Sequence, residues 1–306
     1  MRFFDAHCDT LDLLNDKNSL YDCDTHYNFK KAAKYDTHIQ VAAIWIDADI
    51  HDPAERANAL CERFKAETKN IGVIRTKHDL ASANGVNVIL GIEGGEPVGN
   101  DIKNLRCLFD KGVRVLTLVW NHDNAIGGCA ALGNSGLTTF GKEVVSEMER
   151  LGIVVDVSHL SEKGFYDVYE VSKKPFIASH SNSKAVFPHF RNLTDEQFKC
   201  LIERRGVTGI NFYPEFLGHN ADIDSIAAHI EHFMALGGED SVGLGSDFDG
   251  IECTPHGISG AEDLDKIANK LLRLNYSEEL VEKISYKNME RVFGEILPNG
   301  KENENE

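Results

Sequence analysis

Eight short runs of apolar, β-prone residues recur along the chain, each ends in polar residues, and helix-length segments lie between them. Near-continuous Val, Ile and Leu content is typical of strands that are buried on both faces, as in a parallel sheet. The eight runs are 2–7, 39–46, 86–95, 113–123, 153–161, 175–181, 207–214 and 241–250. Strand and helix alternating eight times predict an α/β protein built as a (β/α)8 TIM barrel.

Four segments between or after these runs carry helix signals. Residues 52–70 begin with a proline near the helix start, and residues 138–152 end at Gly152. Thr194 is a candidate N-cap for residues 193–206, and Ser277 is one for the last helix. The main rival fold is a doubly wound open sheet, but no GxGxxG or P-loop motif follows any run. We therefore expect one barrel domain over residues 1–297 and a polar tail over residues 298–306.

Composition excludes several classes of function. The formal net charge of −17 argues against nucleic-acid binding, because phosphates would be repelled. The apolar runs are too short to span a bilayer, and no basic segment followed by an apolar one marks a secretion signal. The number of cysteines, 7, is odd, and the sequence has no CxxC motif, which indicates reduced thiols in the cytoplasm. We expect a small-molecule substrate, no nucleic-acid or membrane partner, and an open possibility of a homodimer.

Polar side chains follow the predicted strands at the end where barrel enzymes place their active sites. In strand order they are His7 and Asp9, Glu93, Trp120 with Asn121 and His122, His159, His180, Asn211 with Tyr213, and Asp247. Each residue alone has a structural explanation, such as a satisfied buried histidine, a loop cap or a surface acid. Three histidines and three carboxylates at one end of different strands make a shared site the better interpretation.

These residue types predict a site for two divalent metal ions. His7 and Asp9 would hold one ion, His159 and His180 would hold the other, and Glu93 would bridge them. Imidazole and carboxylate ligands without cysteine suit zinc, and manganese or iron as well. A water between two ions becomes a hydroxide near neutral pH and attacks a carbonyl, while Asp247 serves as general base and acid. The sequence therefore predicts metal-assisted hydrolysis of an amide or a related bond.

Other candidates are assigned structural roles. His229 and His232 fall in the middle of a helical segment and are expected to be surface or half-buried. Cys8 points away from His7 and Asp9 in an extended strand, so we expect packing rather than nucleophilic chemistry. Asp249 is a second acid near Asp247, and Asp247 is preferred because it directly ends the apolar strand.

The motifs HCD, GIEGG, VDVSHLS, SHSNSKAVFPHFRN and GLGSDFDG, in this order, resemble the membrane (renal) dipeptidase family, peptidase family M19 of the amidohydrolase superfamily. The resemblance implies a barrel of the metal-dependent hydrolase type with two zinc ions, which cleaves dipeptides and often accepts a C-terminal D-amino acid. It implies His7, Asp9 and Glu93 as ligands of the first zinc. It further implies Glu93, His159 and His180 as ligands of the second zinc, Asp247 as the catalytic acid and base, and Arg191 as the residue that binds the substrate carboxylate.

The chain departs from the family at Trp120, where members similar to the mammalian enzyme have a histidine that contacts the scissile carbonyl. His122 or Asn121 could take over that contact, and Trp120, Asn211 and Tyr213 are further candidate substrate contacts. Mammalian members are secreted and lipid-anchored; neither signal is visible here, so we expect a cytoplasmic, bacterial-type member. We expect a binuclear zinc dipeptidase that uses a metal-bridging hydroxide. The alternatives are a hydrolase of another small amide, such as an N-acyl amino acid or a lactam, and a non-catalytic metal-binding barrel.

Overall fold

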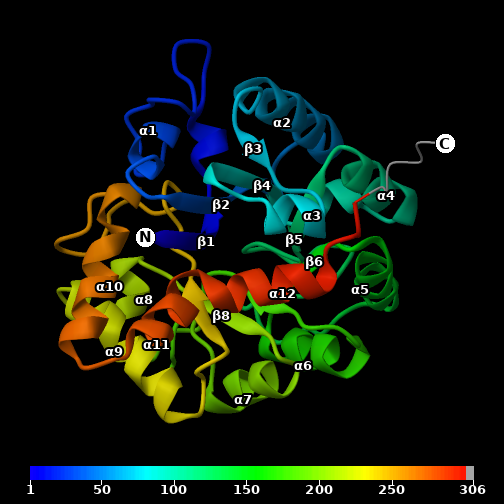
Figure 1. Ribbon diagram of the computed structural model, residues 1–306. Coiled ribbons are helices and arrows are strands. Elements are labelled where there is room, and N and C mark those ends of the chain that lie inside the picture. Colours follow the sequence, from blue (N-terminus) through cyan, green and yellow to red (C-terminus); the bar gives the residue numbers. More distant parts are fainter. Residues whose placement is uncertain (301–306) are drawn as a thin grey trace.

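The centre of the protein is a closed barrel of parallel strands, seen in a computed structural model that describes residues 1–300 (Figure 1). The strands are β1 (Arg2–Cys8), β2 (Thr37–Trp45), β3 (Gly72–Val73), β4 (Gly85–Glu93), β5 (Val113–Thr117), β6 (Val154–Asp156), β7 (Ile177–Ala178), β8 (Val207–Ile210) and β9 (Val242–Leu244). Their order is β2-β1-β9-β8-β7-β6-β5-β4-β3, and an additional β2–β4 pairing closes the ring. The closed ring confirms the predicted (β/α)8 barrel and rules out the open sheet.

The strand β3 was not predicted and does not belong to the ring. It has two residues, which pair with Asn87 and Val88 of β4. The strand β5 begins to pair with β4 only at Leu90, so β3 occupies the stretch of β4 that β5 leaves free. A two-residue strand has no periodicity that sequence analysis can detect.

Helices lie around the ring, as Figure 1 shows. They are η1 (Thr10–Leu13), α1 (Phe29–Ala32), α2 (Pro53–Glu67), α3 (Lys77–Ala81), η2 (Glu96–Val98), α4 (Ile102–Asp110), α5 (Thr139–Leu151), α6 (Glu162–Val171), α7 (Asp195–Glu203), α8 (Pro214–Leu217), α9 (Ile223–Ala235), η3 (Ala261–Asp263), α10 (Leu264–Arg273), α11 (Glu278–Glu282), η4 (Lys283–Lys287) and α12 (Asn288–Ile296). The predicted caps and the end at Gly152 are confirmed, whereas α7 ends at Glu203, before the predicted end at Gly206. Thr194 caps α7 with a capping box, Ser277 caps α11, and Gly152 ends α5 with φ 87°.

The N-terminal end of the barrel is closed by the last helix. Met289, Val292 and Phe293 of α12 are buried in one hydrophobic cluster with inward-facing strand residues. The ring of Phe293 lies 4.8 Å from that of Phe4 in β1. Figure 1 shows α12 running across the strands. Because apolar side chains fill the inside of the barrel at this end, polar groups can gather inside the barrel only at its carboxyl end.

The domain prediction placed the tail at residues 298–306. The backbone oxygen of Pro298 accepts a hydrogen bond from the backbone N–H of Lys77 at 3.0 Å. Residues 301–306 of the predicted tail lie outside the described residues. Within residues 1–300 no helix combines the length and the apolar character needed to cross a membrane. All 7 cysteines, which lie within residues 1–300, are unpaired in the structure.

Candidate active site

Three strands that lead to predicted site residues end earlier than their sequence runs suggested, and those site residues lie beyond the strand ends. The strand β6 stops at Asp156, before His159, and β7 stops at Ala178, before His180. Likewise β9 stops at Leu244, three residues before Asp247. His7 and Glu93 lie within the last two residues of their strands, and they meet the residues beyond the other strand ends at the barrel mouth. The six residues that meet there are His7, Asp9, Glu93, His159, His180 and Asp247.

One oxygen of Glu93, the last residue of β4, lies at the centre of the cluster. Glu93 Oε1 is 3.0 Å from His159 Nε2, 3.3 Å from His180 Nε2 and 3.6 Å from His7 Nε2. Glu93 is 3% exposed. A carboxylate that faces three imidazoles from different strands is placed to serve two ligand groups at once.

The potential ligand atoms divide into groups that share Glu93. His7, Asp9 and Glu93 form one buried group whose ligand atoms lie within 4.8 Å of one another, and Glu93, His159 and His180 form another. The side chain of Asp9 approaches His7 with Oδ2 3.3 Å from Nε2. The structure thus brings all five predicted metal ligands together in the predicted division.

A third group of possible ligands consists of His7, Asp156 and His180, with Asp156 in place of Asp9 or Glu93. The carboxylate of Asp156 is already occupied. Its Oδ1 accepts hydrogen bonds from the backbone N–H groups of Ser158 and Ser179, and its Oδ2 accepts from the hydroxyls of Thr117 and Ser179. Four donors use the acceptor capacity of a carboxylate, so Asp156 has no lone pair left for a cation.

The donor set fits divalent cations. Within residues 1–300, the buried atoms His7 Nε2 and Asp9 Oδ1 have no hydrogen-bond partner, a costly state unless something else binds them. The Nε2 atoms of His159 and His180 face each other at 3.0 Å. Unpaired imidazole nitrogens and carboxylates pointing at one another are what zinc, manganese or iron ligation requires.

The two histidines of the second group are oriented by their other ring nitrogens. His159 Nδ1 lies 2.9 Å from Asn121 Oδ1, and His180 Nδ1 lies 2.7 Å from Ser179 Oγ. Such partners fix the orientation of a metal-binding imidazole. Asn121 was predicted as a substrate contact, and the structure engages its oxygen with His159 while the residue also lines the cavity described below.

Two site residues have backbone conformations that are unusual for residues with a side chain. His159 has φ 66° and Asp247 has φ 62°. Hydrogen bonds hold both in place, from Ala130 N to His159 O at 2.8 Å and from Asp247 N to His7 O at 3.2 Å. Left-handed non-glycine residues gather at functional sites, where the surrounding structure imposes them.

Burial and mutual charge shape the titration of the site. Burial alone would lower the pKa of His7, but the carboxylates of Asp9 and Glu93 outweigh it and raise the pKa well above its usual value. Burial lowers the pKa of His159 to about 4, with Arg191 adding to the effect. Burial also raises the pKa of Asp9 well above its usual value. A bound divalent cation would favour the ionised form of these buried carboxylates.

Asp247, the predicted catalytic residue, faces the ligands. Its Oδ1 lies 3.9 Å from His7 Nε2, and its Oδ2 accepts a hydrogen bond from Asn211 Nδ2 at 2.9 Å. Burial raises the pKa of Asp247 to about 6. The second acid, Asp249, instead accepts hydrogen bonds from the backbone N–H groups of His26 and Tyr27, so it holds a loop.

A cavity of about 410 Å³ opens over these residues. The predicted residues that line it are Trp120, Asn121, Tyr213, Asp9, Glu93, His159 and Asp247. Trp45, which the sequence analysis did not name, packs edge-on against Trp120 with ring centroids 5.0 Å apart. Asn211 lies behind Asp247, while His122 lies outside this cavity with Nε2 3.7 Å from Asp47 Oδ1.

Arg191 is a buried cation beside the cluster. It is 5% exposed, and its Nε and Nη2 atoms have no hydrogen-bond partner among residues 1–300. Its guanidinium lies 5.6 Å from the ring centre of Phe216, which lines the cavity. Burial lowers the pKa of Arg191, and Asp247 and Glu93 oppose that effect. Arg191 does not line the cavity of about 410 Å³; it lines a small neighbouring cavity of about 30 Å³ together with His159. Its Nε and Nη2 groups have the geometry to bind a carboxylate that reaches them.

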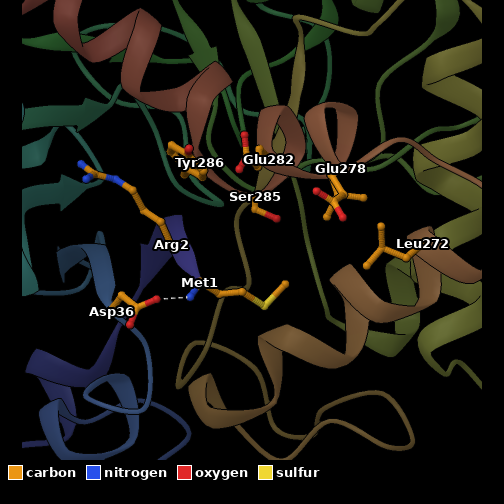
Figure 2. A pocket seen from close by; sticks show the side chains of 9 residues that line it. Met1, Arg2, Asp36, Leu272, Glu278, Glu282, Ser285 and Tyr286 are labelled. Carbon is orange, nitrogen blue, oxygen red and sulfur yellow. Dashed lines mark hydrogen bonds and ion pairs between the residues drawn. The ribbon is translucent and has the colours of Figure 1, made fainter.

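Figure 2 shows a second cavity, of about 350 Å³, at the N-terminal end of the barrel. Glu278, Glu282 and Tyr286 line it together with Met1 and Arg2. Arg2 pairs with Glu290, and the amino group of Met1 contacts Asp36. None of the metal-ligand groups described above contributes to this cavity, so we assign it no chemistry.

The secondary expectations had mixed outcomes. The prediction for His229 is wrong, because this residue is 0% exposed. Its buried ring is satisfied by a hydrogen bond accepted from Ser183 N and by Leu217 O at 3.1 Å. His232 is half-buried as predicted, beside Asp195. Cys8 is buried as predicted, and burial raises the pKa of its thiol well above its usual value, which disfavours a nucleophilic role.

Sequence reasoning missed several supporting residues. Asp156 and Ser179 act behind His180, and a charged residue inside the apolar run VVDVS was the available signal. Gly250 was also missed. A Cβ at Gly250 would lie 2.2 Å from Asp9 Oδ2 and 2.7 Å from Asp247 Oδ1, so only glycine leaves these carboxylates in place.

Comparisons with protein families and with curated proteins both point to dipeptidases. A model of the membrane dipeptidase family, peptidase family M19, matches residues 1–306. An uncharacterised dipeptidase of Schizosaccharomyces pombe is 37% identical over 221 residues, which are 68% of this chain and 52% of that relative. A second one from the same yeast is 36% identical over 217 residues, 69% of this chain and 53% of its own length. The chain thus spans about half the length of these curated relatives.

Solved structures resemble the whole barrel. A metallopeptidase of family M19 named dipeptidase AC has a TM-score of 0.88 at 30% identity, covering 97% of this chain and 99% of its own. A metallopeptidase from Rhodobacter sphaeroides, liganded with a phosphinate mimic of the dipeptide L-Ala-D-Ala, has a TM-score of 0.84 at 29% identity, with the same coverage of both chains.

Proposed function

The chain belongs to the membrane dipeptidase family, peptidase family M19, and from this we propose that it is a binuclear zinc dipeptidase. The observation that supports this most directly is the position of Glu93, whose single oxygen lies within reach of His7, His159 and His180. Glu93 would bridge two zinc ions, with His7 and Asp9 on one side and His159 and His180 on the other. Such a pair would supply a hydroxide near neutral pH and polarise the scissile carbonyl.

The protein's own groups would handle the proton. Asp247 would accept the proton of the attacking water at its carboxylate and deliver it to the leaving amine. Asn211 donates to Oδ2 of Asp247, and Oδ1, on the side of His7, is the oxygen left to face the cluster. Burial supports this role, because it raises the pKa of Asp247 to about 6 and so brings it closer to neutral pH.

The substrate would be a dipeptide with a free carboxyl terminus. The unpaired Nε and Nη2 of Arg191 would bind that carboxylate. The cavity of about 410 Å³ is sized for a small substrate, and Trp120 and Tyr213 would contact it. The L-Ala-D-Ala mimic bound by the Rhodobacter sphaeroides metallopeptidase supports tolerance of a D-amino acid at the second position.

The test combines metal analysis with an activity assay on the purified protein. We expect about two zinc ions per chain and release of amine from L-L and L-D dipeptides. Glu93→Gln should lose both metals and activity, while Cys107→Ser, at an exposed position, is the matched control. Two metals without dipeptide cleavage would move the proposal to another small amide. Absence of bound metal after zinc is added back would overturn it.

The cytoplasmic location and a homodimer stay predictions from the sequence. Cell fractionation and light scattering of the purified protein test them.

A further inference from the structure

A buried hydrogen-bond relay runs from β6 to a metal-ligand histidine. Asp156, Ser179 and His180 are each 0% exposed. Ser179 Oγ lies 2.6 Å from Asp156 Oδ2 and 2.7 Å from His180 Nδ1. Asp156 Oδ1 is occupied by the backbone N–H groups of Ser158 at 3.0 Å and Ser179 at 2.8 Å. The relay is therefore anchored on both oxygens of one carboxylate.

The chemistry of the three groups gives this relay one direction. A carboxylate only accepts hydrogen bonds, so the single hydroxyl proton of Ser179 is committed to Asp156. The Ser179 oxygen can then only accept from the ring of His180, which requires the hydrogen on Nδ1. A neutral imidazole with its hydrogen on Nδ1 has its lone pair on Nε2. In this structure Nε2 is the atom that faces Glu93 Oε1 at 3.3 Å.

We propose that Asp156 and Ser179 are positioning residues that fix the Nδ1–H tautomer of His180 and thereby keep its Nε2 lone pair free for a metal ion. The inference rests on the proposed metal site but not on dipeptide cleavage. It assigns a purpose to a buried carboxylate that takes no part in ligation. Its neighbour Ser158 supports the same arrangement, because its hydroxyl oxygen accepts from the backbone N–H of His180 at 3.0 Å.

The barrel contains a matched control for this relay. Asp5 in β1 is also 0% exposed and receives the backbone N–H of Ser246 at 2.8 Å and its hydroxyl at 2.5 Å. Among residues 1–300 the Ser246 hydroxyl makes no hydrogen bond to an imidazole ring; its other neighbours are His7 O at 3.3 Å and Phe248 N at 3.2 Å. Ser246→Ala thus removes the same bond to a buried aspartate without touching a histidine ring.

The decisive variant is Asp156→Asn, which keeps the shape of the side chain. One amide oxygen can still accept the two backbone N–H groups, so the NH₂ group takes the place of Oδ2 and donates to Ser179 Oγ. The Ser179 hydroxyl then turns its proton toward His180 Nδ1, which forces the hydrogen of the ring onto Nε2. Ser179→Ala is the second variant, because it removes the relay without reversing it.

The experiment measures the tautomer and the zinc affinity separately. The tautomer of His180 is measured by nitrogen-15 NMR on metal-free, histidine-labelled protein, with its signal identified by its loss in His180→Asn. Zinc affinity is measured by competition with a chromophoric chelator. We expect an Nδ1–H ring in the wild type and in Ser246→Ala, an Nε2–H ring in Asp156→Asn, and no fixed preference in Ser179→Ala.

Zinc affinity of one of the two sites should fall by about 10–100-fold in Asp156→Asn, the range for lost outer-shell partners, and by less in Ser179→Ala. Ser246→Ala should have the zinc affinity of the wild type, even if its midpoint of unfolding is lowered as much as that of Ser179→Ala. A wild-type tautomer in Asp156→Asn, or equal zinc loss in both serine variants, would overturn the inference. If Asp156→Asn fails to fold, the comparison of the two serine variants decides.

The outcomes separate this inference from the proposed function. Zinc bound without dipeptide cleavage would refute the dipeptidase proposal and leave the relay standing. An Nε2–H ring in the wild type would refute the relay, whatever the enzyme cleaves.

Discussion

Replacing Arg191 by methionine tests how the protein recognises its substrate. Methionine keeps an unbranched apolar stem beside Phe216 and removes the guanidinium. Among residues 1–300, nothing accepts a hydrogen bond from Nε or Nη2 of Arg191, and both atoms are buried, so water does not screen their contact with a substrate carboxylate. A hydrogen bond to a charged group contributes about 1.5–3 kcal/mol, and two contribute about 3–6 kcal/mol. At about 1.4 kcal/mol per factor of ten, kcat/KM should fall about 10²–10⁴-fold.

The assay compares a dipeptide with the same dipeptide carrying a C-terminal amide, on wild type and Arg191→Met of equal metal content. Only the free carboxylate engages the guanidinium, so the loss should be confined to the dipeptide and the amide should be cleaved equally by both proteins. Arg191→Lys keeps the charge but cannot form the bidentate contact, so its kcat/KM for the dipeptide should lie between those of the wild type and Arg191→Met. Equal losses on both substrates would refute the reasoning, because they would mean that Arg191 acts on the fold or the metal site.

Three further predictions follow from individual side chains. Asp247→Asn should lower kcat by about 10²–10⁴-fold, the usual contribution of a general acid–base group, with metal content unchanged by elemental analysis; a loss of metal instead would make Asp247 a ligand. Burial lowers the pKa of His229 to about 4, below its unfolded value of about 6.5, so its contribution to stability is complete above pH 6.5 and is lost as the pH falls toward 4. That loss is about 3 kcal/mol at pH 4. In urea unfolding, the free energy of unfolding should therefore fall less steeply with decreasing pH in His229→Gln than in the wild type; the same fall in both proteins would contradict the prediction. Gly250→Ala should weaken zinc binding at least about tenfold in chelator competition, because its Cβ would meet the carboxylates of Asp9 and Asp247; wild-type affinity would show that the loop yields.

Local pattern accounts for much of what could be predicted. Runs such as VNVILGIEGG combine β-branched residues with a polar end, and that combination places Glu93 at the carboxyl end of β4 without knowledge of any other strand. The same reasoning placed His7, His159 and His180 at one end of the barrel. Capping residues such as Thr194 act within one turn of the chain, so they were also predictable.

The roles of the individual acids depend on partners that are distant in the sequence. By their position in the strands, Asp5 and Asp156 look like ligands. The hydroxyl of Ser246, 241 residues away from Asp5, donates a hydrogen bond to Asp5, and the hydroxyl of Ser179 donates one to Asp156. Asp249 is likewise taken up by the loop at His26 and Tyr27, which leaves Asp247 facing the cluster. Whether a buried carboxylate has a free lone pair depends on which donors the fold brings to it.

By itself the sequence determined a parallel barrel, the end of it that is polar, and the five candidate metal ligands that gather there, because strand periodicity and strand-end composition are local properties. Only the tertiary structure decided that His229 is buried, that Nε and Nη2 of Arg191 have no hydrogen-bond partner among residues 1–300, and that four donors occupy the carboxylate of Asp156. Those outcomes depend on which groups remain unpaired after folding, and pairing across a closed barrel joins residues that no local pattern connects.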